Sequence, residues 1–283
     1  MAALPMITTG KDSSVWYIDT QERIWRWVVQ GWVQPNPTDR AVYISAGNVN
    51  NVWATNREDR VFRYDGVSWK QPDPYARLVC VSAADDGSVW GVNRQGAVYC
   101  LENSGSKWVE PVPSFRAAQV SAGSASNVWA VNNEGRIFKW TGSGWNEPRS
   151  TDRATVISAG ADGTVWCVNP QQRLFRREGD NWVEPDPNAR AVRVSCGDAD
   201  DVWCINQQDS AYRLINNRWV EMPLPFPRLE YRLHTVAQGE SLSAIAQKYA
   251  TTMWSIISAN PQYPSLKWNP DYIQVGWVLR IPT

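Results

Sequence analysis

Twelve of the 18 tryptophans recur at a fixed period in the part of the chain that ends at Trp219. They form two sets of six, and successive members of each set are 37 residues apart, except for one step of 39 residues. The first set, in which each tryptophan follows a valine, is Trp16, Trp53, Trp90, Trp129, Trp166 and Trp203, and the second set is Trp32, Trp69, Trp108, Trp145, Trp182 and Trp219. A period of roughly 20–50 residues is typical of solenoids and propellers, in which each repeat packs on the next. The tryptophans therefore limit this part of the chain to a repeat fold.

Each repeat contains four short β-strand patterns separated by turn residues. In the fourth repeat, apolar or alternating segments occur around Val120, at 128–131, at 136–140 and at Trp145. Between them lie turn residues, including Asn133-Glu134-Gly135, and no segment has the apolar period of a helix. Four antiparallel strands in roughly 40 residues form the blade of a β-propeller. We therefore predict a mainly β chain with a six-bladed propeller of four-stranded blades over residues 1–222.

Three smaller motifs follow the same period. A triplet of the Ser-Ala-Gly type follows each predicted first strand as a turn, as at 45–47, and Asn or Asp follows each predicted second strand. An arginine lies eight residues after five of the second-set tryptophans, at Arg40, Arg77, Arg116, Arg153 and Arg190, and Arg228 follows Trp219 by nine. Residues 2–8 match the first strand of blade one and residues 219–222 the last strand of blade six. Whether these two ends share a blade stays open.

The repeated pattern Val-Trp-x-x-Asn … Trp resembles the tectonin repeat of six-bladed propeller lectins of the tectonin and tachylectin type. The resemblance covers about residues 1–222. It implies sugar binding, because known members bind bacterial surface glycans and methylated glycans. It also implies a non-enzymatic adaptor role as an alternative, because repeats of this type serve as adaptors. Neither implied function is catalytic.

The pattern changes after Trp219. Three alternating prolines in residues 223–231 predict an extended, semi-rigid linker. Residues 232–283 then read as a small α+β domain of order βααβ, with a strand at 234–236, two short helices and a final strand at 276–281. This second domain has its own apolar helical stripe at Leu242, Ile245, Ala246 and Tyr249.

The segments HTVAQGESLSAIAQKY, IISANPQ and NPDYIQVGWVLRIP resemble a LysM domain over about residues 234–282. This resemblance implies binding of polymers that contain N-acetylglucosamine, such as peptidoglycan or chitin. It places the sugar groove between two loops, with Leu242 and Ile273 as an apolar floor, and the residues that it implies are Gly239, Glu240, Ser241, Leu242, Ile273, Gln274, Val275 and Gly276. Some LysM modules in phage-tail-like machines dock proteins instead.

Two tryptophans depart from the LysM pattern. Trp277 stands where a polar residue is common, and Trp268 lies in an insertion before Asn269-Pro270. Both extend a sugar platform in one interpretation and pack on the propeller in the other.

The periodic residues of the propeller also have two interpretations. A residue that occupies the same position in every blade usually packs one blade on the next, so we expect the twelve periodic tryptophans to be core. Aromatic residues outside the two sets are better candidates for display to a ligand, namely Trp27, Tyr64 and Trp140. Each lies two residues after another aromatic residue on the same strand face, so it also suits the core. The arginines bind neighbouring loops or read anionic glycans, and the structural role is favoured.

The charge balance argues against nucleic acid as a partner. Lys+Arg and Asp+Glu are 28 each, and no basic stripe occurs. The apolar runs are too short for a membrane span, and no signal peptide pattern opens the chain. We therefore expect cytoplasmic synthesis, with release or delivery to a cell surface by a non-classical route left open.

The residue types also argue against catalytic and metal sites. The single histidine, His234, opens the predicted LysM strand, so a catalytic Ser-His-Asp site or a histidine-rich zinc site is not expected in the propeller. The five cysteines fit no metal spacing and are expected to be buried thiols, although a Cys196–Cys204 bridge is possible. Asp85-Asp86 and Asp200-Asp201 are expected to cap turns.

The sequence thus predicts a non-enzymatic carbohydrate-binding protein without a cofactor. Its partners would be a polymer of N-acetylglucosamine for the LysM domain and surface glycans or proteins for the propeller. The alternative is a structural adaptor in a contractile-injection or phage-tail-like assembly, in which both domains dock protein partners or the cell envelope.

Overall fold

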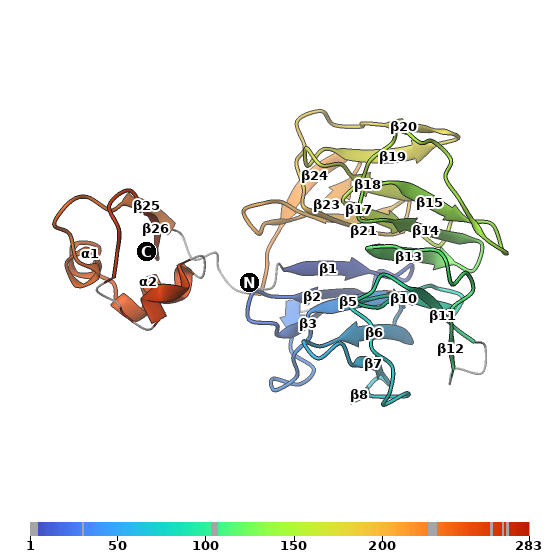
Figure 1. Cartoon of the computed structure of the whole chain (residues 1–283), viewed down its shortest axis with the longest axis horizontal. Helices are drawn as coiled ribbons and strands as arrows, with labels where there is room; N and C mark the ends of the chain where they lie inside the picture. The colour runs from blue at the N-terminus through green and yellow to red at the C-terminus, as the bar shows by residue number, and fades with distance from the viewer. Residues whose placement is uncertain are drawn as a thin grey trace. The chain divides into compact units, whose positions relative to one another are not determined.

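A computed structural model describes residues 5–29, 31–102, 107–225, 231–260, 263–267, 269 and 272–282. The described residues form two compact units, and the first ends at Pro225. Figure 1 shows the elements of both units with their labels.

The first unit contains six four-stranded antiparallel sheets, and each sheet is one blade. Blades 1 to 3 are β1 (Met6–Thr9), β2 (Val15–Ile18), β3 (Ile24–Val28) and β4 (Gly31–Val33); β5 (Tyr43–Asn48), β6 (Asn51–Thr55), β7 (Val61–Tyr64) and β8 (Trp69–Lys70); and β9 (Cys80–Ala83), β10 (Val89–Val92), β11 (Val98–Leu101) and β12 (Trp108–Val109). Blades 4 to 6 are β13 (Gln119–Ser124), β14 (Asn127–Val131), β15 (Ile137–Trp140) and β16 (Trp145–Asn146); β17 (Val156–Ala159), β18 (Val165–Val168), β19 (Leu174–Glu178) and β20 (Asn181–Val183); and β21 (Arg193–Asp198), β22 (Asp201–Ile205), β23 (Ala211–Ile215) and β24 (Arg218–Met222). The predicted propeller of six four-stranded blades is confirmed.

Every blade uses four strands that are consecutive in sequence. Strand β1 pairs with β2 and strand β24 pairs with β23, so the two ends of the propeller do not share a blade. In Figure 1, β1, β13 and β21 lie near the centre of the propeller, whereas β8, β12 and β20 lie at its periphery. The pairings of β1 and β24 thus settle whether the two ends share a blade, which the sequence left open.

The periodic tryptophans pack one blade on the next. Each first-set tryptophan lies on the second strand of its blade and is nearly or fully buried. Five of them meet the second-set tryptophan of the next blade edge to face, with ring centroids 5.8–6.4 Å apart: Trp16–Trp69, Trp53–Trp108, Trp90–Trp145, Trp129–Trp182 and Trp166–Trp219. Trp203 of blade 6 shares a core cluster with Trp32 of blade 1 and completes the ring. Edge-to-face pairs stabilise beyond the area that they bury, which explains the strict repetition.

A ring of hydrogen bonds joins the six innermost strands. The hydroxyl of each repeated serine, or of Thr8 in blade 1, accepts a bond from a backbone N–H of the next blade. The donors and acceptors are Ala46 N to Thr8, Ala83 N to Ser45, Ala122 N to Ser82, Ala159 N to Ser121, Cys196 N to Ser158 and Thr9 N to Ser195, at 2.8–3.2 Å. The last bond links blade 6 to blade 1. The expectation that these triplets form turns is therefore wrong, because their serine and alanine lie within the first strands.

Odd and even blades alternate in the hairpin between their first two strands. In blades 2, 4 and 6 the first strand carries a register shift, and it has six residues instead of the four found in blades 1, 3 and 5. In the odd blades, Asp12, Asp86 and Asp162 accept a backbone N–H from the hairpin of the next blade, at 2.6–3.0 Å. The propeller thus consists of three blade pairs.

The second unit contains β25 (Tyr231–Thr235), α1 (Leu242–Lys248), α2 (Met253–Ala259), a 3-10 turn η1 (Pro264–Lys267) and β26 (Val278–Pro282). Strands β25 and β26 pair antiparallel, with Thr235 opposite Val278. The side chain of Ser241 accepts the backbone N–H of Ala244 and caps α1, as its position before an apolar stripe predicts. The predicted βααβ order is observed.

The first part of the expected linker packs on the propeller. The indole N–H of Trp32 donates to the backbone oxygen of Pro223 at 2.8 Å, and Leu224 lies against the core cluster that joins blades 6 and 1. Residues 226–230 of the expected linker, which include Arg228, lie outside the described residues.

Candidate functional site

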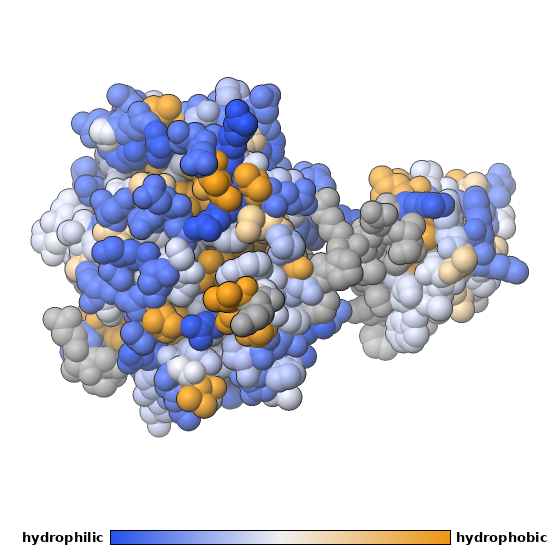
Figure 2. Space-filling view, turned by 180° about the vertical axis from the view of Figure 1, so that it is seen from behind, coloured by the Kyte–Doolittle hydropathy of each residue, from blue (hydrophilic) through white to orange (hydrophobic). Residues whose placement is uncertain are grey.

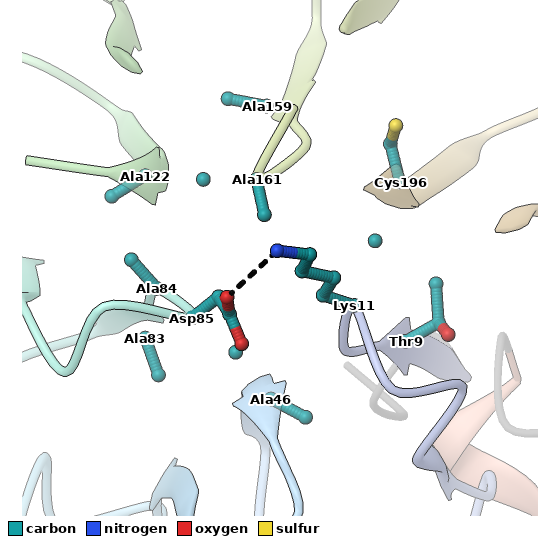
Figure 3. A pocket seen from close by; sticks show the side chains of 13 residues that line it. Thr9, Lys11, Ala46, Ala83, Ala84, Asp85, Ala122, Ala159, Ala161 and Cys196 are labelled. Carbon is teal, nitrogen blue, oxygen red and sulfur yellow. Dashed lines mark ion pairs between the residues drawn. The ribbon is translucent and has the colours of Figure 1, made fainter. Parts of the chain in front are cut away.

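The centre of the propeller is too narrow for a sugar. It is lined mostly by glycine and alanine, and Lys11 Nζ lies 3.4 Å from a carboxylate oxygen of Asp85 (Figure 3). A Cβ atom at Gly123 would lie 2.0 Å from the backbone oxygen of Gly160, so only glycine allows this approach between blades. The remaining cavity is about 10 Å³, which is close to the space that one water molecule needs. The centre of the propeller is therefore the place where neighbouring blades close against one another.

The grooves between blades differ at one residue, which we call the filler residue. It is the third-strand residue that lies against the first-set tryptophan of the preceding blade. The six filler residues, in blade order, are Trp27, Tyr64, Leu101, Trp140, Arg177 and Leu214. Leucine occupies less space than tryptophan, tyrosine or arginine, so a groove with a leucine filler leaves more room above the tryptophan.

The three predicted display aromatics are thus filler residues. The ring of Tyr64 lies 5.1 Å from that of Trp16, and the ring of Trp140 lies 5.3 Å from that of Trp90. Trp27 packs in the cluster that joins blades 6 and 1. Their position two residues after another aromatic residue already allowed a core role, and the structure gives them that role.

A cavity opens between blades 2 and 3, where the filler is Leu101. It has a volume of about 550 Å³, and its lining includes Asn50, Trp53, Arg63 and Glu102 besides Leu101. Pockets for small ligands typically measure roughly 300–1,000 Å³. We call this site the blade 2–3 cavity. Trp53, which lines the cavity, is 3% exposed, and its indole N–H donates to Asn51 Oδ1 at 2.8 Å.

Several polar groups of this cavity remain available to a ligand. Among the described residues, the guanidinium of Arg63 makes one long hydrogen bond, from Nη2 to the backbone oxygen of Asn50 at 3.4 Å, and no ion pair. The carboxylate of Glu102 lies 3.5 Å from Lys107 Nζ, a pair in which the lysine side chain is 69% exposed. Exposed pairs of this kind contribute little to stability. The cavity therefore offers a guanidinium and a carboxylate beside Trp53 and the aliphatic side chain of Leu101.

The other carboxylates of the cavity hold its walls. Asp86 accepts the backbone N–H and hydroxyl of Ser88 and the backbone N–H of Ala125. Burial raises the pKa of Asp86, but these hydrogen bonds outweigh it and lower the pKa below its ordinary value. Asp85 accepts from the side chain of Asn48 and pairs with Lys11. The expected capping of turns by aspartate thus holds for Asp86, whereas Asp85 joins the ion pair at the centre.

A periodic feature of the sequence points to Arg63, which is not among the predicted site residues. Arg63 lies ten residues after Trp53 and directly opposite it on the neighbouring strand. The same step leads to a cation in five of the six repeats, namely Arg26, Arg63, Lys139, Arg176 and Arg213, whereas Cys100 occupies it in blade 3. Arg176 pairs with Glu178 and Arg213 with Asp201, so these cations differ in availability.

The predicted arginines lie in the loops between blades and bind those loops. Nη1 of each donates to two backbone oxygens of its own loop at 2.7–2.8 Å, as Arg40 does to Pro37 and Asp39. Arg77, Arg116, Arg153 and Arg190 repeat the pattern. The favoured structural interpretation agrees with these contacts, and none of the five arginines lines the blade 2–3 cavity.

The five cysteines are free thiols, and no Cys196–Cys204 bridge forms. The strand register places Cys196 opposite Val202 and Cys204 opposite Val194, so the two sulfur atoms belong to different cross-strand pairs. Burial raises the pKa of both thiols. They are therefore poor nucleophiles at neutral pH.

In the second unit, the two loops implied by the LysM resemblance leave the same end of the paired strands. Val236 donates to the backbone oxygen of Trp277 and Gly276 donates to that of Val236, at 2.8 and 2.9 Å. These bonds bring the loop of Ile273, Gln274, Val275 and Gly276 beside the strand that leads into Gly239, Glu240 and Ser241. Gly239 and Gly276 both adopt positive φ, at 83° and 89°, which glycine allows without strain.

Glu240 and His234 fix the first of these loops. Glu240 Oε2 accepts the backbone N–H of Ala237 at 2.8 Å and lies 2.7 Å from His234 Nε2. The backbone bond and the His234 contact lower the pKa of Glu240. His234 is buried, and its Nδ1 lies 3.1 Å from the hydroxyl of Tyr249, which agrees with its expected structural role.

The expected apolar floor of the LysM groove needs a correction. Leu242 is fully buried in the core of the second unit, so its side chain presents no surface to a ligand. Ile273 is only partly buried and packs against the same core. Trp277 stacks on Tyr263 with centroids 4.0 Å apart and an interplanar angle of 6°, so one of its faces is covered within the unit. Trp268 lies outside the described residues.

Neither a metal cluster nor a spanning helix occurs among the described residues. In that part of the chain, no three His, Cys, Asp or Glu side chains are grouped as metal ligands. Within the same described ranges, no helix is both long and apolar enough to cross a membrane.

A family model of the tectonin domain matches residues 3–114 and 116–269. The chain belongs to the tectonin family. The second matched segment extends beyond blade 6, and none of the comparisons supports the LysM resemblance of residues 232–283. That resemblance continues to depend on the sequence motifs and on the βααβ order.

Solved structures share the fold of this tectonin protein at low sequence identity. The SapL1 lectin in complex with alpha methyl fucoside has a TM-score of 0.55 and 13% identity, over 78% of this chain and 96% of that chain. YCF48 bound to D1 peptide has a TM-score of 0.51 and 17% identity, over 78% and 82% of the two chains. A protein of unknown function from Bacteroides thetaiotaomicron VPI-5482 has a TM-score of 0.55 and 9% identity, over 73% and 68%. The comparison with curated proteins finds no match.

Proposed function

We propose that the propeller is a non-enzymatic lectin module that binds a sugar residue in the blade 2–3 cavity. The observation that carries the proposal is the open cavity beside Trp53, where Leu101 leaves room that Trp27, Tyr64, Trp140 and Arg177 occupy in four of the other grooves. The family and the structural likeness to a lectin that binds alpha methyl fucoside support it.

The chemistry of the cavity fits a neutral sugar. A pyranose presents hydroxyl groups that both donate and accept, beside an apolar C–H face. Arg63 supplies donors, Glu102 supplies acceptors and the Asn50 amide supplies both. Leu101 and Trp53 supply the apolar contact. Convergent polar groups on an apolar wall are typical of small-ligand sites.

A glycan array probed with the full chain tests this function. We expect retention of a subset of glycans that share one terminal or internal sugar. Arg63→Gln would weaken the binding, whereas Arg176→Gln, a matched change in a cation that already pairs with Glu178, would not. Loss of binding in both variants, or in neither, would move the site away from this cavity.

For the second unit, we propose binding of a polymer that contains N-acetylglucosamine. The loops at 239–241 and 273–276 lie beside each other, and Gly239, Gln274 and Gly276 are exposed. Backbone groups of these loops that do not bond within the unit, unlike the Gly276 N–H and the Gln274 carbonyl, are therefore offered to a ligand. Such groups suit the acetamido substituents of peptidoglycan or chitin. Incubation of the full chain with purified peptidoglycan and with chitin tests this part. No retention of a folded protein on either polymer would contradict it.

An adaptor role is the second candidate function, in which the propeller docks a peptide or protein. YCF48, whose structure was solved with a D1 peptide, has a similar fold. The propeller face in Figure 2 is largely hydrophilic with small separate hydrophobic patches. Large exposed apolar patches are typical of protein-binding surfaces, so the visible face favours sugar binding. Co-purification with large particles, without retention on any glycan, would support the adaptor instead.

A further inference from the structure

A second cavity adjoins the first on blade 2. It has a volume of about 480 Å³ and is lined by Asn50, Arg63, Tyr64, Asp65 and Lys70, among others. We call it the rim cavity. Asn50 and Arg63 line both cavities, so the two adjoin at these residues. Each volume alone falls within the range of roughly 300–1,000 Å³ that small ligands occupy, so together they exceed the needs of a monosaccharide.

The strand register aligns the two cavities. Arg63 on β7 lies opposite Trp53 on β6 and opposite Lys70 on β8. Directly opposite residues share one face of a sheet, so Trp53, Arg63 and Lys70 form a row across blade 2. The row spans two strand spacings, about 10 Å, which exceeds the width of one pyranose ring. It runs from the second strand to the outermost strand of the blade.

The charges of the two cavities differ. The blade 2–3 cavity contains three carboxylates, those of Asp85, Asp86 and Glu102, with Arg63 as its one cation among the lining residues. An anionic group is therefore disfavoured there. The rim cavity has two cations, Arg63 and Lys70, and one carboxylate, Asp65.

The lysine of the rim cavity is available to a ligand. Lys70 Nζ lies 3.7 Å from Asp65, and the two side chains are 64% and 41% exposed. Such an exposed pair is weak. Asp65 is also held by the backbone N–H groups of Val67 and Ser68, at 2.9 and 2.8 Å, which keep it in its turn. Lys70 can therefore leave Asp65 without disturbing the hairpin.

We infer that the ligand of this protein is an acidic oligosaccharide that occupies both cavities. A neutral, hydroxyl-rich residue lies in the blade 2–3 cavity, and the adjoining residue places its carboxylate or sulfate over Lys70, with Arg63 between them. This inference rests on the proposed lectin function, because it needs the first cavity to bind sugar. It adds the length and the charge of the ligand, and the direction in which the ligand crosses blade 2.

The test uses the full chain and an array of matched glycans. The array carries neutral monosaccharides, neutral disaccharides, and the uronate and O-sulfated forms of the same disaccharides. We expect an acidic form to bind about tenfold more tightly than its neutral counterpart, as a charge-assisted hydrogen bond allows. Lys70→Gln is expected to remove this preference.

Arg218→Gln is the matched control. It removes the same charge from an exposed position on the last strand of blade 6, and we expect it to leave the preference for the acidic form intact. Equal loss in Lys70→Gln and Arg218→Gln would indicate an effect of net charge and would overturn the inference.

The remaining outcomes distinguish a failure of this inference from a failure of the proposed lectin function. Equal binding of neutral and acidic forms, or of monosaccharides and disaccharides, would overturn the inference and leave the lectin function standing. Binding of no glycan at all by the folded protein would overturn both.

Discussion

The groove between blades 2 and 3 and the groove between blades 3 and 4 have the same pair of tryptophans but different filler residues. Each has a buried first-set tryptophan, Trp53 or Trp90, that meets the second-set tryptophan of the next blade. In the first groove the filler is Leu101, and a cavity of about 550 Å³ opens above Trp53. In the second groove the ring of Trp140 packs on both Trp90 and Trp145, at 5.3 Å from each.

The comparison shows that the size of the filler residue separates these two grooves. The tryptophans set the distance between blades, and the filler residue sets how much of that space remains. Because protein interiors are close-packed, a large filler removes a cavity and a small one leaves it. The repeat therefore supplies six equivalent positions, and single substitutions distinguish them.

The largest effect on glycan binding is expected from Leu101→Trp, which would make the two grooves alike. The added indole should fill the blade 2–3 cavity as Trp140 fills its own groove, and glycan binding should fall by about a hundredfold or more. Titration calorimetry with the best glycan from the array measures the loss. Leu214→Trp is the control, since Arg176 beside that groove already pairs with Glu178. Undiminished binding in Leu101→Trp, with an unchanged melting temperature, would locate the sugar elsewhere.

The reverse change, Trp140→Leu, should open the other groove at a cost in stability. It removes a ring that contacts two tryptophans, and we expect the free energy of unfolding to fall by about 2–3 kcal/mol. Denaturant unfolding followed by tryptophan fluorescence measures this effect. Glycan binding in the blade 2–3 cavity should persist below the unfolding transition. A stability equal to that of the wild type would show that Trp140 is not part of the wall.

A smaller effect is expected from the cation of the open groove. Arg63→Gln should weaken glycan binding about tenfold, because it removes charge-assisted hydrogen bonds while keeping an amide donor. Lys139→Gln changes the corresponding position of blade 4 and should have no effect on binding. The affinities of the two variants for the same glycan test whether Arg63 contributes to binding. Equal affinities would exclude a role for Arg63.

The smallest expected effect concerns the aspartates that link each odd blade to the next. Hydrogen bonds lower the pKa of Asp12, Asp86 and Asp162 despite the opposing effect of burial. Their contribution to stability is therefore present above the ordinary carboxyl pKa of 3.8 and is lost as the pH falls from there through the lowered folded-state pKa. Melting temperatures measured across this range should fall.

Asp162→Asn isolates this contribution away from the candidate site. Its amide group would face the N–H of Ala199, which now donates to the carboxylate at 3.0 Å. We expect a loss of about 0.5–1 kcal/mol at neutral pH, after allowing for solvent exposure, and a weaker dependence on acid. An unchanged acid transition would show that other carboxylates govern it.

The fold was predictable because its determinants repeat. Trp16 and its five equivalents take the same place in each blade, so their period predicted the number of blades, and the patterns within one repeat predicted its four strands. The positions of Ser45 and its equivalents were predicted as turns because Ser-Ala-Gly favours turns locally. Pairing with the second strand of the same blade, such as Ser45 opposite Trp53, places these serines within strands, and the local turn pattern does not show that pairing.

The candidate site was harder to predict because it depends on a departure from the period. Leu101 is unremarkable in sequence, and it matters only because Trp53 of another blade lies beneath it. The position of Arg63 holds a cation in five of the six repeats, but whether that cation is free depends on partners such as Glu178. Exposed loop arginines such as Arg40 recur just as strictly, yet they bind their own loops. The period shows which positions are equivalent, and only the packing shows how they differ.

The ring of hydroxyl bonds has a consequence for how the propeller assembles. No strand is shared between the first and last blades, so each sheet is complete once its own four strands have left the ribosome. Most contacts within a sheet are therefore close in sequence, which favours rapid formation. Only the final seam, where Ser195 accepts the backbone N–H of Thr9, must wait for the whole propeller. Because that seam uses the same kind of bond as the other five interfaces, a circular permutant could begin at any blade without losing a strand pairing.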